Sequence, residues 1–366
     1  MLDHQPSGIG VYSINLINHL FLLYPLESTK NLTVFTPSRL YLNPKLKIVK
    51  LVDLLQSSRY GKLAAVSRFL WNTFIYPFCT RRFDLLFSPT THASFISQNQ
   101  ILTIHDLLSL RFGNINGPQR FYYKYLLPLL VKRATLIIAV SEATKKDIIQ
   151  FLNCPKEKIK VIYNGYDHAR YNVAEQSTGL IKSVYGLSNY FLVIGPTYAH
   201  KNTELLLEAY RDLPEQIRLK HPLAIAGGKQ PYLNLVQTIA TSFKLEAHVY
   251  FLGYVPEDHM AALYKEAYAL VFPSLHEGFG LPLLEAMACG CPVITSDTSS
   301  MPEVCGEAAQ YIQPLEKKSI MQAMLKLATH PELCRQLKAK GLKQAAKFSW
   351  ERTAADIKTI IEHQLN

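Results

Sequence analysis

Residues 269–295 read Ala269-Leu-Val-Phe-Pro-Ser-Leu-His-Glu-Gly-Phe-Gly-Leu-Pro-Leu-Leu-Glu-Ala-Met-Ala-Cys-Gly-Cys-Pro-Val-Ile-Thr295. An apolar run of strand length comes first, followed by a loop with two glycines, a helical pattern and a second apolar run. Short, nearly continuous apolar strands joined by a helix are typical of parallel sheets that are buried on both faces. This segment alone therefore predicts an α/β fold with crossover helices.

The same alternation extends over most of the 366 residues. The other apolar runs are residues 32–35, 85–87, 100–104, 136–140, 159–162, 190–194, 223–226 and 249–252. They form two series, which predict two Rossmann-like, doubly wound domains in a chain of this length. We expect an N-terminal domain over residues 1–168, a C-terminal domain over 187–345 and a final helix over 346–366.

The start of the N-terminal domain is unusual. A doubly wound domain has a strand before its first glycine loop, yet only Met1 and Leu2 precede Asp3-His-Gln-Pro-Ser-Gly-Ile-Gly10. We therefore expect the first strand of this domain to be missing, which leaves open whether the chain is active.

The loop within residues 269–295 carries the strongest chemical signal. Gly278 and Gly280 allow the backbone to approach a ligand closely, and the amides at the start of the following helix favour an anion or a hydroxyl. Glu277 lies in the loop and Glu285 follows it by eight residues on the helix. Their two carboxylates could contact two places along one extended ligand, although a solvated acid beside an ordinary strand–loop–helix connection is the structural alternative.

Other polar side chains follow predicted strands. Lys201 ends the segment Gly195-Pro-Thr-Tyr-Ala-His-Lys201, and His105 follows the strand at 100–104. A lysine in such a loop can neutralise a diphosphate as its charge develops. Alone, however, Lys201 would be a surface lysine, His105 a structural histidine and Gly8-Ile-Gly10 a weak signal.

Together these motifs, in this order, resemble the family 4 glycosyltransferases, whose GT-B architecture has two Rossmann-like domains facing each other across a cleft. The Glu277-to-Glu285 segment resembles the Glu-x7-Glu motif of that family, and the similarity extends over essentially the whole chain. It implies that the last helix, which begins at Ser349-Trp-Glu351, crosses back to the N-terminal domain.

The resemblance also implies the site. Glu285 would bind the donor ribose, Glu277 the donor sugar and Lys201 the diphosphate, and His105 would line the sugar pocket. The catalytic candidates are thus His105, Lys201 and Glu277. The donor-binding candidates are Gly8, Gly10, Gly195, Gly227, Gly278, Phe279, Gly280, Leu281 and Glu285.

The chain departs from the family pattern at three positions. Val11, Pro196 and His200 stand where many relatives carry arginine. The second cation for the diphosphate is therefore not identified; a protonated His200 could partly substitute, or an arginine from elsewhere in the chain could supply it.

The charge is concentrated in the first half of the chain. Residues 1–170 contain 21 Lys and Arg against 9 Asp and Glu, a net charge of +12, whereas residues 171–366 have a net charge of −1. A basic N-terminal domain suits an anionic membrane or a lipid-linked phosphate, although it can also serve solubility alone. No sequence motif indicates nucleic-acid binding.

The aromatic segment Phe69-Leu-Trp-Asn-Thr-Phe-Ile-Tyr-Pro-Phe78 is flanked by arginines. Segments of this kind are more often core helices, and an interfacial helix in a lipid headgroup layer is the alternative. With neither a spanning run nor a signal peptide, and with six scattered cysteines, we expect a cytoplasmic protein that contacts the inner face of the cytoplasmic membrane.

The similarity implies a retaining hexosyltransferase. The sequence has no Asp-x-Asp motif, the usual ligand for a divalent cation on a nucleotide sugar, so we expect the enzyme to work without a metal. It uses no cofactor besides the nucleotide-sugar co-substrate, with GDP-mannose favoured and UDP-glucose open. The acceptor would be a saccharide or a lipid-linked saccharide in surface-polysaccharide assembly. The alternatives are a catalytically impaired GT-B protein that binds a nucleotide sugar, and a nucleotide-sugar 2-epimerase.

Overall fold

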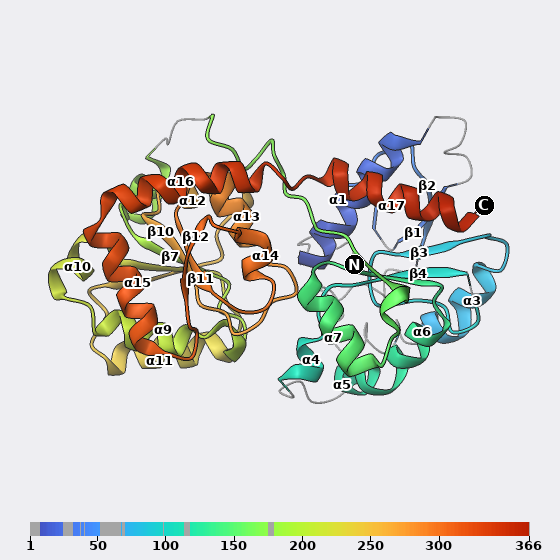
Figure 1. The fold of residues 1–366 in the computed structure, drawn as a ribbon, viewed down its shortest axis with the longest axis horizontal. Helices are drawn as coiled ribbons and strands as arrows, with labels where there is room; N and C mark the ends of the chain where they lie inside the picture. The colour runs from blue at the N-terminus through green and yellow to red at the C-terminus, as the bar shows by residue number, and fades with distance from the viewer. Residues whose placement is uncertain are drawn as a thin grey trace. The chain divides into compact units, whose positions relative to one another are not determined.

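The computed structural model describes residues 8–24, 32–36, 38–39, 41–51, 67, 70–97, 99–112, 118–174 and 179–365 (Figure 1). The chain forms two compact units. Unit 1 comprises Met1–Gly165 and Phe348–Asn366, and unit 2 comprises Tyr166–Lys347. The prediction that the first strand is missing concerns the residues before Asp3, and residues 1–7 lie outside the described part.

Unit 2 is built on one parallel sheet of six strands, in the order β12-β11-β10-β7-β8-β9. The strands are β7 (Phe191–Ile194), β8 (Leu223–Ala226), β9 (Val249–Gly253), β10 (Ala269–Phe272), β11 (Val293–Ser296) and β12 (Ala309–Ile312). The strand order reverses between β7 and β10, which lie side by side at the centre. In sheets of this type ligands bind at the carboxyl ends of the strands, at this reversal.

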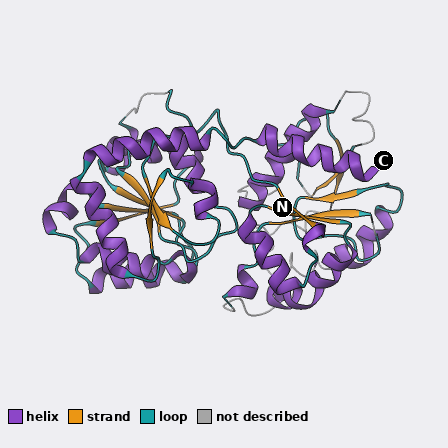
Figure 2. Ribbon diagram, viewed as in Figure 1, coloured by secondary structure: helices purple, strands orange, loops and turns teal. Residues whose placement is uncertain are grey.

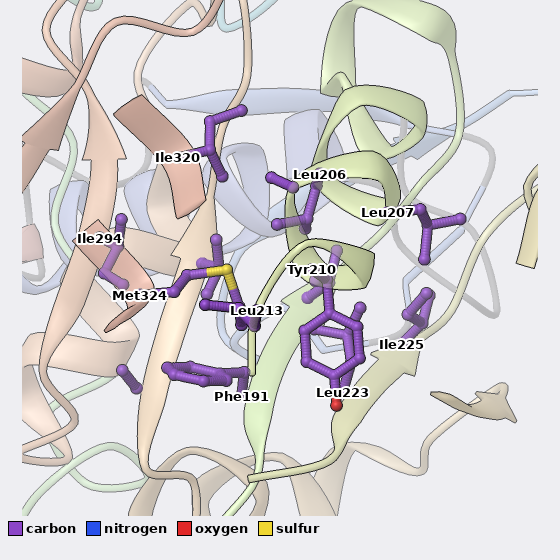
Figure 3. Close-up of a cluster of buried hydrophobic side chains, with 14 of the residues drawn as sticks. Phe191, Leu206, Leu207, Tyr210, Leu213, Leu223, Ile225, Ile294, Ile320 and Met324 are labelled. Atoms are coloured by element: carbon purple, nitrogen blue, oxygen red, sulfur yellow. The ribbon is translucent and has the colours of Figure 1, made fainter. Parts of the chain in front are cut away.

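Helices cover this sheet on both faces (Figure 2). They are α8 (Leu180–Tyr185), α9 (Thr203–Arg211), α10 (Glu215–Lys220), α11 (Tyr232–Ser242), α12 (Glu257–Lys265), α13 (Leu281–Ala288), α14 (Met301–Cys305), α15 (Lys317–Thr329) and α16 (Pro331–Ala345). Figure 3 shows part of the core, in which Leu206 and Tyr210 of α9 and Met324 of α15 pack over Phe191 and Ile225 of the sheet. Central strands that are apolar on both sides explain this double cover, because each face must be buried.

The described strands of unit 1 form two parallel ladders. A two-stranded ladder pairs β1 (Thr33–Thr36) with β2 (Lys47–Lys50). A four-stranded ladder runs in the order β3 (Leu86–Ser88), β4 (Gln100–Ile104), β5 (Leu136–Ala139) and β6 (Ile159–Val161).

The α-helices of unit 1 are α1 (Gly8–Leu23), α3 (Tyr76–Cys79), α4 (Leu108–Arg111), α5 (Pro118–Phe121), α6 (Leu127–Arg133), α7 (Glu142–Leu152) and α17 (Trp350–Leu365). Two π-helical turns, Trp71–Ile75 and Tyr122–Leu126, lead into α3 and α6. Helix α7 begins with a side-chain cap, because the Ser141 hydroxyl accepts a hydrogen bond from the Thr144 amide at 2.9 Å.

The last helix belongs to unit 1, where it packs along α1 (Figure 1). Trp350 is buried and its ring lies edge-on to that of Tyr12, with 5.6 Å between ring centroids. Gly165 approaches Trp350 so closely that an added Cβ would lie 2.1 Å from its backbone nitrogen. The Thr353 hydroxyl donates a hydrogen bond to the Tyr163 carbonyl at 2.8 Å.

The two-domain α/β fold with a returning C-terminal helix is therefore confirmed. The apolar runs predicted from the sequence became strands with ends shifted by a residue or so, and β2 and β12 were missed. In the aromatic segment Leu70, Phe74, Ile75 and Phe78 are exposed, whereas Pro77 is buried and the Tyr76 ring packs edge-on against Phe35, so the described side chains divide between surface and core.

Candidate active site

Four loops of unit 2 leave the carboxyl ends of β7, β8, β10 and β11, and they carry most of the predicted site. Parallel strands place these ends along one edge of the sheet, so residues far apart in sequence become neighbours. The Leu275 amide donates to the His200 carbonyl at 2.8 Å, which joins the loop after β10 to the loop after β7. The Ser299 hydroxyl, after β11, donates to the Glu277 carbonyl at 2.8 Å.

Lys201 and Glu277 form an ion pair across these loops. Lys201 Nζ lies 2.7 Å from Glu277 Oε1, and the two side chains are 18% and 11% exposed. Burial alone would raise the pKa of Glu277, but the Lys201 cation and its hydrogen bond reverse that effect and lower this pKa below its ordinary value. The pair therefore keeps the Glu277 carboxylate ionised beside Lys201 where the strand order reverses.

Backbone geometry holds Lys201 in this position. It ends the 3-10 turn Ala199–Lys201, and Asn202 then adopts a left-handed conformation at φ 58°. The Asn202 side-chain amide donates to the carbonyls of Pro273 at 3.2 Å and Pro314 at 2.6 Å. Asn202 thus ties the lysine loop to the ends of β10 and β12.

His200 does not supply the second cation that its protonation would have provided. The pKa of its imidazole is lowered to about 4, mainly by burial; Glu277 acts in the opposite direction, and the neighbouring Lys201 cation acts in the same direction as burial. The side chain is therefore neutral at physiological pH in the ligand-free protein.

Two predicted donor-binding glycines lie next to each other at the ends of β7 and β8. Gly195 and Gly227 have φ values of 64° and 74°, which favour glycine because L side chains are strained there. A Cβ on Gly227 would lie 3.7 Å from the Cα of Gly195. The two loops therefore present bare backbone at this edge of the sheet, and Gly228, at φ 115°, continues it.

The loop after β10 is pinned from β11 before it enters α13. The Ser300 hydroxyl donates to the carbonyls of Glu277 and Phe279, at 3.1 and 2.9 Å. Gly280 has φ 102° and immediately precedes Leu281, the first residue of α13. The segment Gly278–Leu281 thus brings Glu277 to the positive end of the dipole of α13.

Glu285 lies on α13, where its carboxyl group meets α12. The buried Tyr264 donates a hydrogen bond to Glu285 Oε2 at 2.8 Å. Burial raises the pKa of Glu285 to about 7, while this hydrogen bond and the Arg170 cation act in the opposite direction. Tyr264 was not predictable from the sequence, because its apolar helical setting gives no sign that its hydroxyl reaches a site residue.

The remaining candidates belong to unit 1. His105 follows β4 and packs edge-on against Tyr12 at 4.6 Å between ring centroids. Its Nε2 lies 2.9 Å from the Pro89 carbonyl, and a carbonyl can only accept, so Nε2 carries the proton. Burial lowers the pKa of His105 to about 4, which leaves Nδ1 as an acceptor. Gly8 and Gly10 lie in the first turn of α1, with Gly8 exposed and Gly10 buried.

Unit 2 thus combines an ammonium group, close-approach glycines, a helix start and the Glu277 carboxylate at one sheet edge, and the Glu285 carboxyl lies on the helix that starts there. This set can bind a ligand that has both a charged phosphate part and several hydroxyls. Within the described residues, no group of three or more His, Cys, Asp and Glu side chains could hold a metal ion. No helix in the same part of the chain is long and apolar enough to cross a membrane.

Fold and site together define a protein of the GT-B type. Residues 182–344 match the family model for glycosyl transferases group 1, and residues 30–170 match the model for glycosyltransferase family 4. The O-antigen chain mannosyltransferase B of Escherichia coli is 32% identical over 257 residues, which are 69% of this chain and 68% of that protein. The chain belongs to the family 4 glycosyltransferases.

Further relatives and solved structures agree with this assignment. The serotype-specific mannosyltransferase WbdA of Escherichia coli is 32% identical over 69% of this chain, but the matching segment spans only 32% of that protein. Anabaena HepE, solved in complex with UDP-glucose, matches the fold with a TM-score of 0.75 at 18% identity, covering 99% of this chain and 98% of HepE. WaaG, a glycosyltransferase involved in lipopolysaccharide biosynthesis, also has a TM-score of 0.75, at 15% identity over 98% of this chain and 97% of WaaG.

Proposed function

We propose that this protein is a retaining hexosyltransferase that acts without a metal ion. It transfers a hexose, with mannose favoured, from a nucleotide-diphosphate sugar to a saccharide or lipid-linked saccharide during surface-polysaccharide assembly. The observation that carries this proposal is the partly buried Lys201–Glu277 pair, 2.7 Å apart at the carboxyl ends of the central strands of the unit 2 sheet. Mannosyltransferases that assemble O-antigen chains are among the similar proteins.

Each of the three site residues in unit 2 has a proposed role. Lys201 stabilises the charge that develops on the leaving diphosphate, and the backbone at Gly195 and Gly227 lets the phosphates approach. Glu277, already ionised, accepts hydrogen bonds from hydroxyls of the donor sugar. Glu285 accepts hydrogen bonds from the ribose hydroxyls, and in unit 1 the Nδ1 of His105 accepts one from the sugar.

The reaction proceeds on one face of the sugar. The bond between the anomeric carbon and the phosphate oxygen breaks while the acceptor oxygen bonds to the same face of that carbon. The acceptor proton passes to the departing phosphate oxygen, so no enzyme base is required. The Glu277 carboxylate is paired with Lys201. In this proposal it therefore positions the sugar and does not serve as a covalent nucleophile.

The acceptor is assigned to unit 1, at the inner face of the cytoplasmic membrane. Phe74 and Phe78 are 60% and 59% exposed, and the Arg81 guanidinium lies 4.5 Å from the Phe78 ring centroid. Exposed aromatic rings beside cations are suited to an anionic headgroup layer.

The test is a donor panel of GDP-mannose, UDP-glucose and their relatives with a polysaccharide acceptor, with and without EDTA. We expect release of nucleoside diphosphate, an anomeric configuration that NMR shows to be retained, and no effect of EDTA. If none of the donors in the panel yields nucleoside diphosphate, the chain is a binding protein. Conversion of UDP-GlcNAc in the absence of an acceptor would indicate a 2-epimerase.

Variants assign the roles. Lys201→Ala should lower kcat by about 100-fold or more, the size of effect seen when a preorganised charge is removed. Lys340→Ala is the matched control, because it breaks an exposed pair with Glu307 (3.3 Å) on another part of unit 2. Glu277→Ala should lower kcat more than it raises KM, whereas Glu285→Ala should mainly raise the donor KM. Equal effects of the two glutamate variants on both constants would contradict these roles.

A further inference from the structure

A second apolar and basic surface lies on unit 1, on the helical segment of residues 118–133. Phe121, Tyr125 and Leu129 are spaced four residues apart and are 55%, 52% and 52% exposed. Side chains at this spacing lie on one side of a helix. The segment therefore presents a row of three large apolar side chains, here called the 121–129 row.

The surroundings of this row are positively charged. Arg120 and Lys124 are exposed beside it, and Lys124 Nζ lies 5.3 Å from the Tyr125 ring centroid. Together with Phe121 and Tyr125 they line a shallow hollow. Residues 118–133 also contain Lys132 and Arg133 but no aspartate or glutamate.

The opposite side of the segment is fixed in the core of unit 1. Leu127, Leu130 and Val131 are buried against the strands. The Tyr122 hydroxyl donates a hydrogen bond to the Thr91 carbonyl at 2.7 Å. The 121–129 row is therefore held outward by a packed helix and cannot turn its apolar side chains inward without breaking that core.

We propose that the 121–129 row docks on an anionic lipid bilayer, with the aromatic rings and Leu129 in the headgroup region and Arg120 and Lys124 on lipid phosphates. An aliphatic side chain aligned with two rings and flanked by cations suits a headgroup layer, where apolar burial and charge attraction act together. This inference deepens the proposed membrane contact of unit 1, which was assigned through Phe74 and Phe78. It adds a second element that is separated from them in sequence.

The experiment measures binding of the full chain to extruded vesicles by flotation. One vesicle set is phosphatidylcholine, and the other contains about 30% phosphatidylglycerol, enough to give a negative surface potential. The wild type should bind only the second set, and less at high salt. Lys124→Glu should lower the partition coefficient by about fivefold or more, and the double variant Phe121→Ser/Tyr125→Ser by about tenfold.

Leu219→Ser on α10 of unit 2 is the matched control, since Leu219 is 66% exposed and outside the site. It should bind as the wild type does. Transfer to a water-soluble acceptor, measured on all variants, verifies that they are folded and separates membrane docking from the transferase proposal. Equal vesicle binding by the wild type and the double variant would overturn the inference. Tighter binding of the wild type to a single-stranded oligonucleotide than to the vesicles, lost in the double variant, would also overturn it.

Discussion

Glu277 and Glu285 lie on one short segment, yet their pKa values are shifted in opposite directions. For Glu277, burial is outweighed by the Lys201 cation 2.7 Å away, so its pKa is lowered. For Glu285, burial prevails over the Tyr264 hydrogen bond and Arg170, and its pKa rises to about 7. Two carboxyl groups separated in this way can serve different purposes at one pH.

The raised pKa of Glu285 predicts pH-dependent donor binding. Between about pH 4.5 and pH 7, Glu285 is protonated in the folded protein but ionised in the unfolded chain. The free energy of unfolding therefore falls as the pH rises through this window. The carboxylate is also the better acceptor for ribose hydroxyls. The donor KM should therefore fall by about tenfold from pH 6 to pH 8, in proportion to the ionised fraction.

Two variants test whether Glu285 causes this pH dependence of the donor KM. In Glu285→Gln the donor KM should be high and independent of pH. In Tyr264→Phe the hydrogen bond that lowers the pKa of Glu285 is lost, so the midpoint of the KM profile should move upward while kcat stays unchanged. A wild-type KM that does not change across this range would contradict the assignment.

At the scale of elements, α13 depends on the backbone just before it. Gly280 has φ 102°, and a Cβ there would lie 2.9 Å from Leu283 Cδ1. The Leu283 side chain can move aside, but a side chain at this φ is strained, so relief of the strain would shift the start of α13. The shift would move Glu277, because the same loop carries both residues.

Gly280→Ala should therefore lower the free energy of unfolding by about 1–2 kcal/mol and raise the donor KM several-fold. Gly186→Ala is the control, because Gly186 has φ 69° at the end of α8 with nothing within 4 Å of an added Cβ. It should cost similar stability and leave KM unchanged. Urea titration and initial rates measure the two quantities, and an unaltered KM in Gly280→Ala would exclude the proposed coupling.

Elements were predictable where sequence periodicity reflects burial. Strands β4, β8 and β10 were predicted to the residue, since every one of their side chains is buried. Strand β2, Lys47–Lys50, has lysines at both ends, and β12, Ala309–Ile312, is an edge strand that is only partly buried, so neither stood out. The Lys201–Glu277 contact spans 76 residues and depends on strand order, which local sequence does not encode.

At the scale of the whole molecule, unit 1 is completed by residues from both ends of the chain. Gly165→Ala would place its Cβ against the backbone of Trp350, so the start of α17 must move away from residue 165 and its packing on α1 is disturbed. We expect the free energy of unfolding of unit 1 to fall by about 3 kcal/mol, the cost of overpacking a rigid contact. Hydrogen exchange should show reduced protection in α1 and α17 and unchanged protection in unit 2.

Gly8→Ala is the comparison for this variant, because a Cβ at Gly8 meets nothing within 4 Å. Alanine is also the better helix former, so this change in α1 should not reduce stability. Wild-type exchange rates in Gly165→Ala would show that α17 does not need this close approach.

The order of these segments along the chain also governs how the protein is made. Unit 2 is one uninterrupted segment, Tyr166–Lys347, whereas unit 1 lacks α17 until the residues after 347 have been added. Domains generally fold as units while the ribosome is still at work, the first one earliest. We therefore expect unit 2 to be able to close once Lys347 has been added, whereas unit 1 closes only when Trp350 joins His105 in covering Tyr12.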